Sequence, residues 1–154
     1  MDKIDSLNQV AEFHKTFKHP VLDTPQIPDA KRCELRVALL QEELNELKEA
    51  IENNDLIEVA DALCDIQYVL SGAVLEFGMG EKFVELFNEV QRSNMSKACE
   101  NREEAEQTVE HYKKRGFSAH IEQADGKFLV YRDGDKKTLK SVNYSPADLK
   151  RILG

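Results

Sequence analysis

Positive charge is missing from a long stretch of this 154-residue chain, because no Lys or Arg lies between Ile51 and Glu81. The same stretch carries Glu58, Asp61 and Asp65 in "DLIEVADALCDIQYVL", a segment that is apolar on almost all sides when placed on a helix. Carboxylates there are expected where water is scarce, and an unpaired buried charge is very costly unless a cation, a basic partner or a shifted pKa relieves it. The sequence therefore predicts a cation supplied from elsewhere, and a hard divalent metal ion is the simplest candidate.

The chain also lacks features of membrane and disulfide-bonded proteins. It has no apolar run long enough to span a bilayer, and its N-terminal sequence "MDKIDSLNQV" does not have the pattern of a signal peptide. Its three cysteines, Cys33, Cys64 and Cys99, are odd in number and do not have metal-ligand spacing. We expect Cys64 to be a small core residue and the protein to reside in a reducing cytoplasm.

Composition limits the classes of partner. Charged residues make up 32% and hydrophobic residues 41%, which is ordinary for one globular domain with a small appendage. The net charge of -8 disfavours nucleic acid and anionic membranes as partners. An anionic substrate would need a metal bridge or a local cluster of basic residues.

Hydrophobic periodicity predicts four helices before residue 97, at residues 2–18, 30–52, 55–77 and 80–92. Three of the four prolines lie in "HPVLDTPQIPDA", which predicts an extended loop after the first helix. Asp29 and Asp55 are positioned to cap the second and third helices. Short links between the later helices favour an antiparallel bundle.

The C-terminal third has a different pattern. A charged helix ending at Gly116 precedes two apolar segments around "ADGK", which predict a strand, a turn and a strand. A short last helix is expected with Ser145 as its cap and Pro146 at its first position. The predicted fold is mainly α, an antiparallel four-helix bundle with a small C-terminal α+β insertion containing a β-hairpin. The predicted divisions are a catalytic bundle at 1–97, the insertion at 98–133 and a tail at 134–154 that returns to the bundle.

Acidic residues fall into stripes on two consecutive predicted helices. At roughly 100° per residue, the three acids of the third helix occupy an arc of about 60°. On the second helix Glu42, Glu46 and Glu49 form a stripe apart from the main apolar face, in line with further apolar residues. Glu-rich helices are often simply solvated faces, and this alternative applies to "ELNELKEA" taken alone. The third helix has no solvated polar face to which its acids could belong, so the combined pattern favours metal binding.

These motifs resemble those of a known enzyme superfamily. "EELNE" and "EVAD" form an EExxE motif followed by ExxD, and "NMSK" follows at residues 94–97. The combination resembles the all-α nucleoside triphosphate pyrophosphohydrolases, the MazG-like and phosphoribosyl-ATP pyrophosphohydrolase-like proteins, and is closest to their short dimeric dUTPase-like branch. The resemblance covers residues 13–97 and 139–149. Residues 98–133 depart from the usual short form, in which a brief loop joins "NMSK" to the tail.

The resemblance implies a role for each motif residue. The magnesium ligands of the family match Glu43, Glu46, Glu58 and Asp61, and the acid that orients or deprotonates the attacking water matches Glu42. Positions near the phosphates match Asn94 and Lys97. Asp65 is read as a site residue acting through water, although it could instead pair with a Lys or Arg of the insertion. Tyr144 could close over the nucleotide, or it could be an ordinary packing tyrosine.

The implied reaction is water attack at the α-phosphorus of dUTP or another (d)NTP, which releases a nucleoside monophosphate and pyrophosphate. Carboxylate oxygens suit Mg²⁺, with Mn²⁺ as a substitute, and no His or Cys in the cluster favours zinc. The family builds its sites between subunits, so we expect a homodimer or a dimer of dimers. Among "AEFHKTF", Phe13, His14 and Phe17 could stack on the base; alternatively the two phenylalanines pack in the core and His14 has a surface role.

Two other classes of helical protein are alternatives to the hydrolase. Di-iron carboxylate bundles require Glu-x-x-His pairs, and the chain contains none. A non-catalytic helical module could instead bind a partner protein through the charged insertion. Such a module has no need to keep a stripe of acids on a buried helix, which favours the hydrolase.

Overall fold

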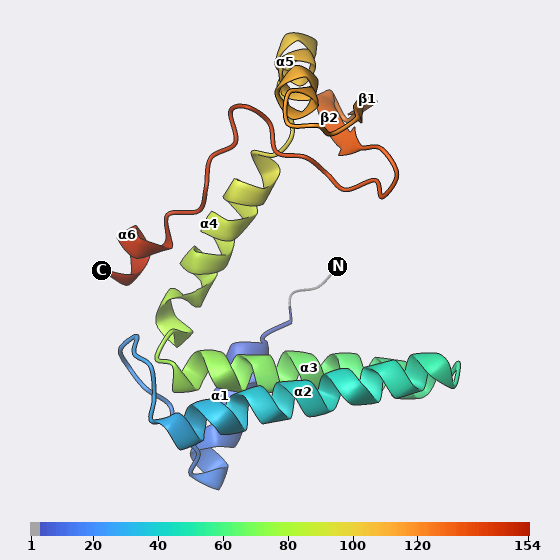
Figure 1. Cartoon of the computed structure of the whole chain (residues 1–154). Helices are drawn as coiled ribbons and strands as arrows, with labels where there is room; N and C mark the ends of the chain where they lie inside the picture. Colours follow the sequence, from blue (N-terminus) through green and yellow to red (C-terminus); the bar gives the residue numbers. More distant parts are fainter. Residues whose placement is uncertain (1–3) are drawn as a thin grey trace. The chain divides into compact units, whose positions relative to one another are not determined.

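The computed structural model describes residues 4–154, and the chain divides after Phe83 into two compact units. Figure 1 shows the order of the elements along the chain. The predicted mainly α fold with a C-terminal β-hairpin is confirmed. The predicted domain boundaries after residues 97 and 133 stay a prediction.

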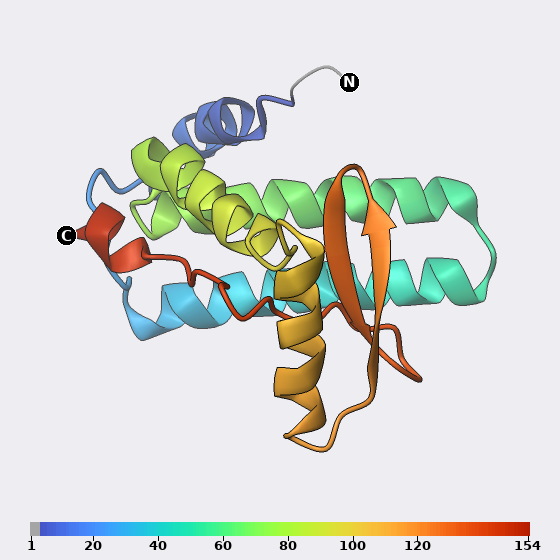
Figure 2. The ribbon, with the colours of Figure 1, turned by 90° about the horizontal axis from the view of Figure 1, so that it is seen from above.

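The first unit is built on a helical hairpin. Helix α2 (Ala30–Glu52) and helix α3 (Leu56–Glu76) run antiparallel and are joined by residues 53–55 (Figures 1 and 2). Asp29 accepts a hydrogen bond from the Arg32 amide at 3.1 Å, and Asp55 accepts one from the Ile57 amide at 3.0 Å. Both predicted caps are confirmed, and each satisfies a backbone donor that the first helical turn would otherwise leave free.

Helix α1 (Ser6–Phe17) packs against the C-terminal half of α3. The first helix was predicted to begin at residue 2; the observed helix begins at Ser6, residues 4 and 5 are not helical, and residues 2 and 3 lie outside the described part of the chain. The proline-rich loop that follows is extended as predicted, and it is tied to α3 by a hydrogen bond from the Leu22 amide to the Leu75 carbonyl at 3.0 Å. Gly78 has φ of +69°, and a Cβ there would lie 1.9 Å from the Thr24 carbonyl oxygen. Only glycine fits this position.

A polar and charged cluster lies where α1, α2 and α3 meet; His14, Arg36 and Glu76 are buried in it, and Arg32 is partly exposed at its edge. Glu76 accepts hydrogen bonds from both arginines, including one from Arg32 Nε at 3.0 Å. A Cβ at Gly72 would lie 2.8 Å from Arg36 Nη1 and 3.0 Å from His14 Nε2. The glycine therefore lets α3 approach the cluster closely.

Helix α3 is not buried along its whole length, contrary to the expectation from its apolar sequence. Val74 and Leu75 are buried, but Leu56 and Ile57 are each 80% exposed. Cys64, expected in the core, is exposed as well. Within this unit α1 contacts α3 around residues 67–72, so the N-terminal half of α3 has only α2 beside it. Hydrophobic periodicity shows how apolar the helix is, and the other elements of residues 4–83 do not cover all of it.

The second unit contains a small α+β core. It includes most of α4 (Phe83–Met95), then α5 (Arg102–Lys113), β1 (Ala119–Ala124), β2 (Lys127–Arg132) and α6 (Leu149–Leu153). The strands pair antiparallel from Ala119 with Arg132 to Ala124 with Lys127. Their turn residues Asp125 and Gly126 both have positive φ, as a two-residue type I′ turn requires. The buried core joins Cys99, Ala105, Val130 and Leu139.

Several predicted helix boundaries are wrong, including the end of α5, which lies at Lys113 rather than Gly116. The fourth helix is preceded by a 3₁₀ turn, η1 (Gly80–Lys82), and continues to Met95 rather than residue 92. The last helix begins at Leu149 with Asp148 as its cap, and Ser145 lies outside it. The Ser145 hydroxyl accepts a hydrogen bond from Arg92 Nη1 at 3.0 Å, and the Ser145 backbone bonds the Ser96 hydroxyl.

Within residues 4–154 no single helix has both the length and the apolar composition needed to cross a membrane. Only Leu56–Glu76 and Gly80–Met95, considered together as a broken pair, pass that test of length and composition.

Candidate active site

Glu43 lies at the centre of the acidic residues of α2 and α3. Burial raises its pKa above the usual range, and the negative charges of Glu46, Asp65, Glu42 and Asp61 raise it further. A pKa shift of this origin requires the carboxylates to lie in one another's field. The structure thus brings together five of the six acids predicted from the two motifs and their neighbour.

The Glu43 carboxylate has an orphaned oxygen. Its Oε2 is buried, and no hydrogen-bond partner for it exists among residues 4–154. Within residues 4–83 Glu43 also has no ion pair with a Lys or Arg. Buried polar atoms are nearly always satisfied, and a cation is one kind of group that would satisfy a carboxylate oxygen among other carboxylates.

The dry environment predicted for the acids is only partly present. Glu43 and Asp65 are half-buried, whereas Glu42, Glu46, Glu58 and Asp61 are exposed. The prediction of a water-excluded cluster is therefore wrong for four of the six side chains in this chain. These side chains are exposed because the N-terminal half of α3 has α2 beside it and no further element of its own unit.

A cleft of about 360 Å³ lies beside the α2–α3 turn. Its lining comprises Glu46, Glu49, Ala50, Asn53, Asp55 and Glu58. It places one residue of each acidic motif, Glu46 and Glu58, at the same opening. Sequence reasoning did not assign Glu49 to the site, although its spacing of three residues from Glu46 was a visible signal. Asp55 is occupied with capping α3 and is a poor candidate ligand.

The predicted ligands have the chemistry that suits a hard divalent cation, but their side chains do not converge on one point. All four predicted ligands are carboxylates, the donors that Mg²⁺ prefers. However, in the part of the chain that the structure describes, no group of three His, Cys, Asp or Glu side chains converges closely enough to hold a metal ion. The orphaned oxygen of Glu43 is the observation that favours a cation here.

The predicted phosphate-side residues come together in the second unit. Lys97 Nζ donates to Asn94 Oδ1 at 2.9 Å. The Tyr144 hydroxyl lies 3.0 Å from Ser93 Oγ, and this hydrogen bond, with the nearby charges of Lys140 and Lys97, lowers the tyrosine pKa. The ring of Tyr144 lies 4.2 Å from Lys140 Nζ. Both readings of Tyr144 remain compatible with this position, because it packs on α4 and also faces two cations.

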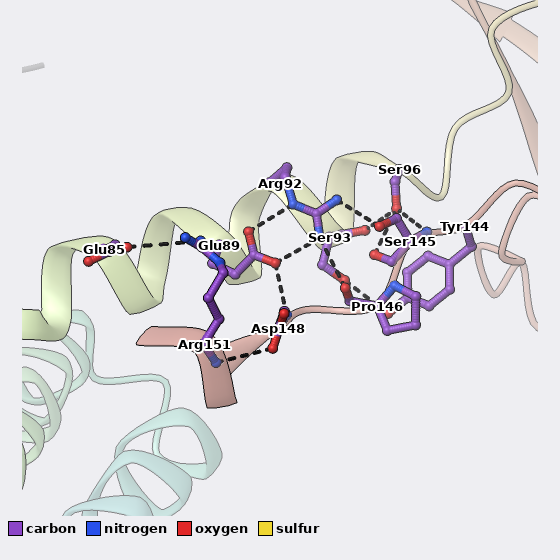
Figure 3. Close-up of polar contacts among 10 residues, drawn as sticks. All are labelled: Glu85, Glu89, Arg92, Ser93, Ser96, Tyr144, Ser145, Pro146, Asp148 and Arg151. Atoms are coloured by element: carbon purple, nitrogen blue, oxygen red, sulfur yellow. Dashed lines mark hydrogen bonds and ion pairs between the residues drawn. The ribbon is translucent and has the colours of Figure 1, made fainter. Parts of the chain in front are cut away.

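The tail is fastened to α4 by a polar network that sequence reasoning missed (Figure 3). Arg92 forms two hydrogen bonds with Glu89, at 2.8 Å each, and further bonds with Ser145 Oγ and the Pro146 carbonyl at 3.0 Å. Glu89 also accepts from the Asp148 amide at 2.8 Å. The signal in the sequence was the i, i+3 spacing of Glu89 and Arg92 just before "NMSK".

The alternative in which Phe13 and Phe17 pack in the core and His14 lies on the surface is wrong. His14 is 2% exposed and its Nδ1 lies 2.9 Å from the Pro20 carbonyl, whereas Phe17 is 60% exposed. Phe13 stacks with His19 at 5.8 Å between centroids and meets Tyr68 edge-on at 5.6 Å. The histidine is internal because it belongs to the polar and charged cluster, and the phenylalanines remain partly open.

Comparison with known families settles the relationship. The sequence model described as "Phosphoribosyl-ATP pyrophosphohydrolase", PRA-PH, matches residues 10–94, which is more than half of the chain. The chain belongs to the phosphoribosyl-ATP pyrophosphohydrolase family. The match contains all six acids and Asn94, and it ends before Lys97 and the α+β region. Membership of this family, within the all-α nucleoside triphosphate pyrophosphatase superfamily, suggests a pyrophosphohydrolase that acts on a nucleotide, and the family is typically magnesium-dependent.

This family member is also similar to a viral protein along its whole length. That relative is "Uncharacterized protein L479" from Acanthamoeba polyphaga mimivirus. The two are 26% identical over 243 aligned positions, which cover 99% of this chain and 97% of the relative. The alignment is longer than this chain, so the relative has residues that are aligned with gaps in this chain.

Proposed function

We propose that this chain is a magnesium-dependent nucleoside triphosphate pyrophosphohydrolase. It would hydrolyse dUTP or another (d)NTP at the α-phosphorus to a nucleoside monophosphate and pyrophosphate. The observation that carries the proposal is the buried, unpartnered Oε2 of Glu43 among four other carboxylates, inside the region that matches the family.

Glu43, Glu46, Glu58 and Asp61 would hold Mg²⁺, or Mn²⁺ in its place. When bound, the ion supplies positive charge to the phosphates and lowers the pKa of a coordinated water. Glu42 is exposed one residue before Glu43, so its carboxylate is available to orient a water molecule or accept its proton.

Asn94, Lys97 and Tyr144 would bind the substrate. The Lys97 ammonium is held by Asn94 and provides a point charge for phosphate oxygens, and Tyr144 would close over the nucleotide. Asp65 would act through water, because it lies near Glu43 and is half-buried.

Base recognition is proposed for Phe13 and Phe17, whose rings are partly exposed and lie 4.4 Å apart between centroids. Exposed aromatic faces stack on any base, which leaves base and sugar preference to be measured. Membership of the dUTPase-like branch belongs to this proposal and predicts that dUTP is the best substrate.

A homodimer or a dimer of dimers is part of the proposal. Large apolar side chains are exposed on both helices of the hairpin, namely Val37, Leu44, Ile51, Leu56, Ile57 and Leu63. An exposed apolar surface of this kind is typical of an interface. A second subunit covering α3 would also remove water from the acids, which supplies the dry environment that one chain does not. We place the protein in the cytoplasm, with no nucleic acid or membrane as partner.

The direct test is a screen of all (d)NTPs with detection of released pyrophosphate, with Mg²⁺ and with EDTA. Glu46→Gln and Asp61→Asn should each abolish release, and Glu34→Gln, an exposed acid outside the motifs, should keep the parent rate. If both site variants hydrolysed nucleotides as fast as the parent, the assignment of the site would be wrong.

A thermal melt separates the enzyme from a non-catalytic interaction module. A ligand that binds only the folded state raises the melting temperature, so Mg²⁺ or Mn²⁺ should stabilise the parent. Glu46→Gln should reduce that shift. Coincident melts with and without either metal would favour a module that acts through residues 98–133.

A further inference from the structure

A basic cleft of about 270 Å³ lies between α5, β2 and the segment that follows β2, within residues 84–154. Five of its lining residues are cationic: Lys97, Arg115, Arg132, Lys137 and Lys140. Its remaining lining includes Tyr112 and Phe117 and contains no Asp or Glu.

This concentration of positive charge is not a consequence of composition. Residues 84–154 contain 13 Lys and Arg against 12 Asp and Glu, so their net charge is close to zero. Five of those 13 cations nevertheless line one cleft. Residues 1–83 carry 8 basic against 17 acidic residues, so the chain is strongly acidic elsewhere.

Most of the cleft cations are not neutralised by carboxylates. Arg132 bonds Asp135 through Nε at 2.9 Å. Within residues 84–154, Arg115, Lys137 and Lys140 form no ion pair with an Asp or Glu. Like charges gathered without counter-charges repel one another, and an anion relieves that repulsion.

The cleft is also held in place by the backbone. The Arg132 amide donates to the Lys137 carbonyl at 2.9 Å, and the Lys140 amide donates to the Tyr112 hydroxyl at 3.2 Å. Beside the cations, Phe117 is 41% exposed and the Arg132 guanidinium lies 5.7 Å from its ring centroid. A set of cations on a backbone held in this way, next to a partly exposed aromatic ring, suits a phosphate group carried by a planar ring.

We propose that this cleft binds an oligophosphate anion, a pyrophosphate group either free or carried by a nucleotide, without a metal ion. The volume suits a small anion, and the cationic side chains provide charge-assisted hydrogen bonds. The inference does not rest on the acidic residues of α2 and α3. Lys97 belongs both to "NMSK" and to the cleft, so the variants below leave it unchanged.

The experiment is calorimetric titration of the full chain in EDTA, in which the acids of the first unit repel an anion. The ligands are inorganic pyrophosphate, ADP and adenosine. We expect pyrophosphate and ADP to bind, adenosine not to bind, and the affinity to fall with added salt. Arg115→Gln combined with Lys137→Gln should weaken pyrophosphate binding about tenfold or more, because each lost contact is a charged one. Absence of binding by both phosphate ligands would overturn the proposal.

The matched control is Lys114→Gln combined with Lys150→Gln, which removes the same charge from exposed positions outside the cleft. Its affinity should stay within about twofold of the parent, since only long-range screening is altered. An equal loss in the two double variants would overturn the proposal, because it would show a response to net charge alone.

Further arms distinguish the sources of the anion. Tighter binding of ADP than of pyrophosphate, with the difference lost in Phe117→Ser, would support a nucleotide, and equal binding would support free pyrophosphate. A single-stranded oligonucleotide could bind more tightly than ADP or pyrophosphate and lose that binding in Arg115→Gln combined with Lys137→Gln. That result would overturn the small-ligand proposal. Glu46→Gln should keep pyrophosphate affinity in EDTA, so failure of the proposed hydrolase would not be mistaken for failure of the cleft.

Discussion

Arg36 on α2 donates a hydrogen bond from Nη2 to Oε1 of Glu76 on α3, and both side chains are more than nine-tenths buried. Arg32 bonds the other carboxylate oxygen. Removing one partner of such a pair leaves an uncompensated buried charge. We expect Glu76→Gln to lower the free energy of unfolding by about 3–5 kcal/mol, measured by urea denaturation. Glu34→Gln, at an exposed position of α2, should change it by less than about 0.5 kcal/mol.

The same pair predicts sensitivity to acid. Burial alone would raise the Glu76 pKa, but the hydrogen bonds from Arg36 and Arg32 outweigh it and lower the pKa below the ordinary 4.5. A carboxyl with a lowered folded-state pKa stabilises the protein above its unfolded pKa, and that stability is lost as pH falls through the folded value. The melting temperature of the parent should therefore fall more steeply below pH 4.5 than that of Glu76→Gln. Parallel pH profiles of the two proteins would contradict this assignment.

Local signals made much of the fold predictable. Asp29 and Asp55 are capping residues with the spacing that caps require, and Asp125 with Gly126 suits a tight hairpin turn, so the neighbouring elements begin where they were predicted to within a few residues. The Arg36–Glu76 pair was not predictable in this way, because its partners lie 40 residues apart and no local rule joins them.

The candidate site was predictable to a similar degree. Helical periodicity placed the acids of α2 and α3 on stripes that face the same region, and the raised pKa of Glu43 agrees. Periodicity could not report which apolar faces the chain itself covers. For this reason the exposure of Leu56 and Ile57 was not predicted, nor was the solvent exposure of the carboxylates near them.

His14 predicts a second dependence on pH. Burial lowers its pKa below 6.5, as does Arg36, and these effects outweigh the hydrogen bond to the Pro20 carbonyl. The unfolded chain then binds a proton more readily than the folded one, so stability present above pH 6.5 is lost as pH falls toward the folded pKa. The parent should melt a few degrees lower at pH 5.5 than at pH 7.5. His14→Gln should show a smaller difference, and His111→Gln, on the exposed side of α5, should match the parent.

Glu43→Gln should stabilise the metal-free protein at neutral pH. Burial and four neighbouring carboxylates raise the Glu43 pKa, so the folded state disfavours its charge, and the stability this group contributes at low pH is lost as pH rises through the folded pKa. In EDTA at pH 7 the variant should melt about 1–4 °C above the parent. With Mg²⁺ the order should reverse, because the parent alone gains from the ion. Glu52→Gln, an exposed acid of the same helix, is the control, and an equal rise there would show relief of net charge only.

Arg92 should control how firmly the tail is held on α4. Its bonds to Glu89, together with the Asp148 amide, lower the Glu89 pKa to about 2, so the network persists at moderately acidic pH. Arg92→Ala removes the arginine's bonds to Glu89, Ser145 and Pro146 and leaves Glu89 with the Asp148 amide. Amide hydrogen exchange at residues 145–153 should then be about tenfold faster, because local opening becomes easier. Arg102→Ala, which removes an exposed arginine of α5, should leave these amides unchanged. Unchanged exchange in Arg92→Ala would mean that the contacts that do not involve Arg92 secure the tail, namely Tyr144 with Ser93, Ser145 with Ser96 and the Asp148 amide with Glu89.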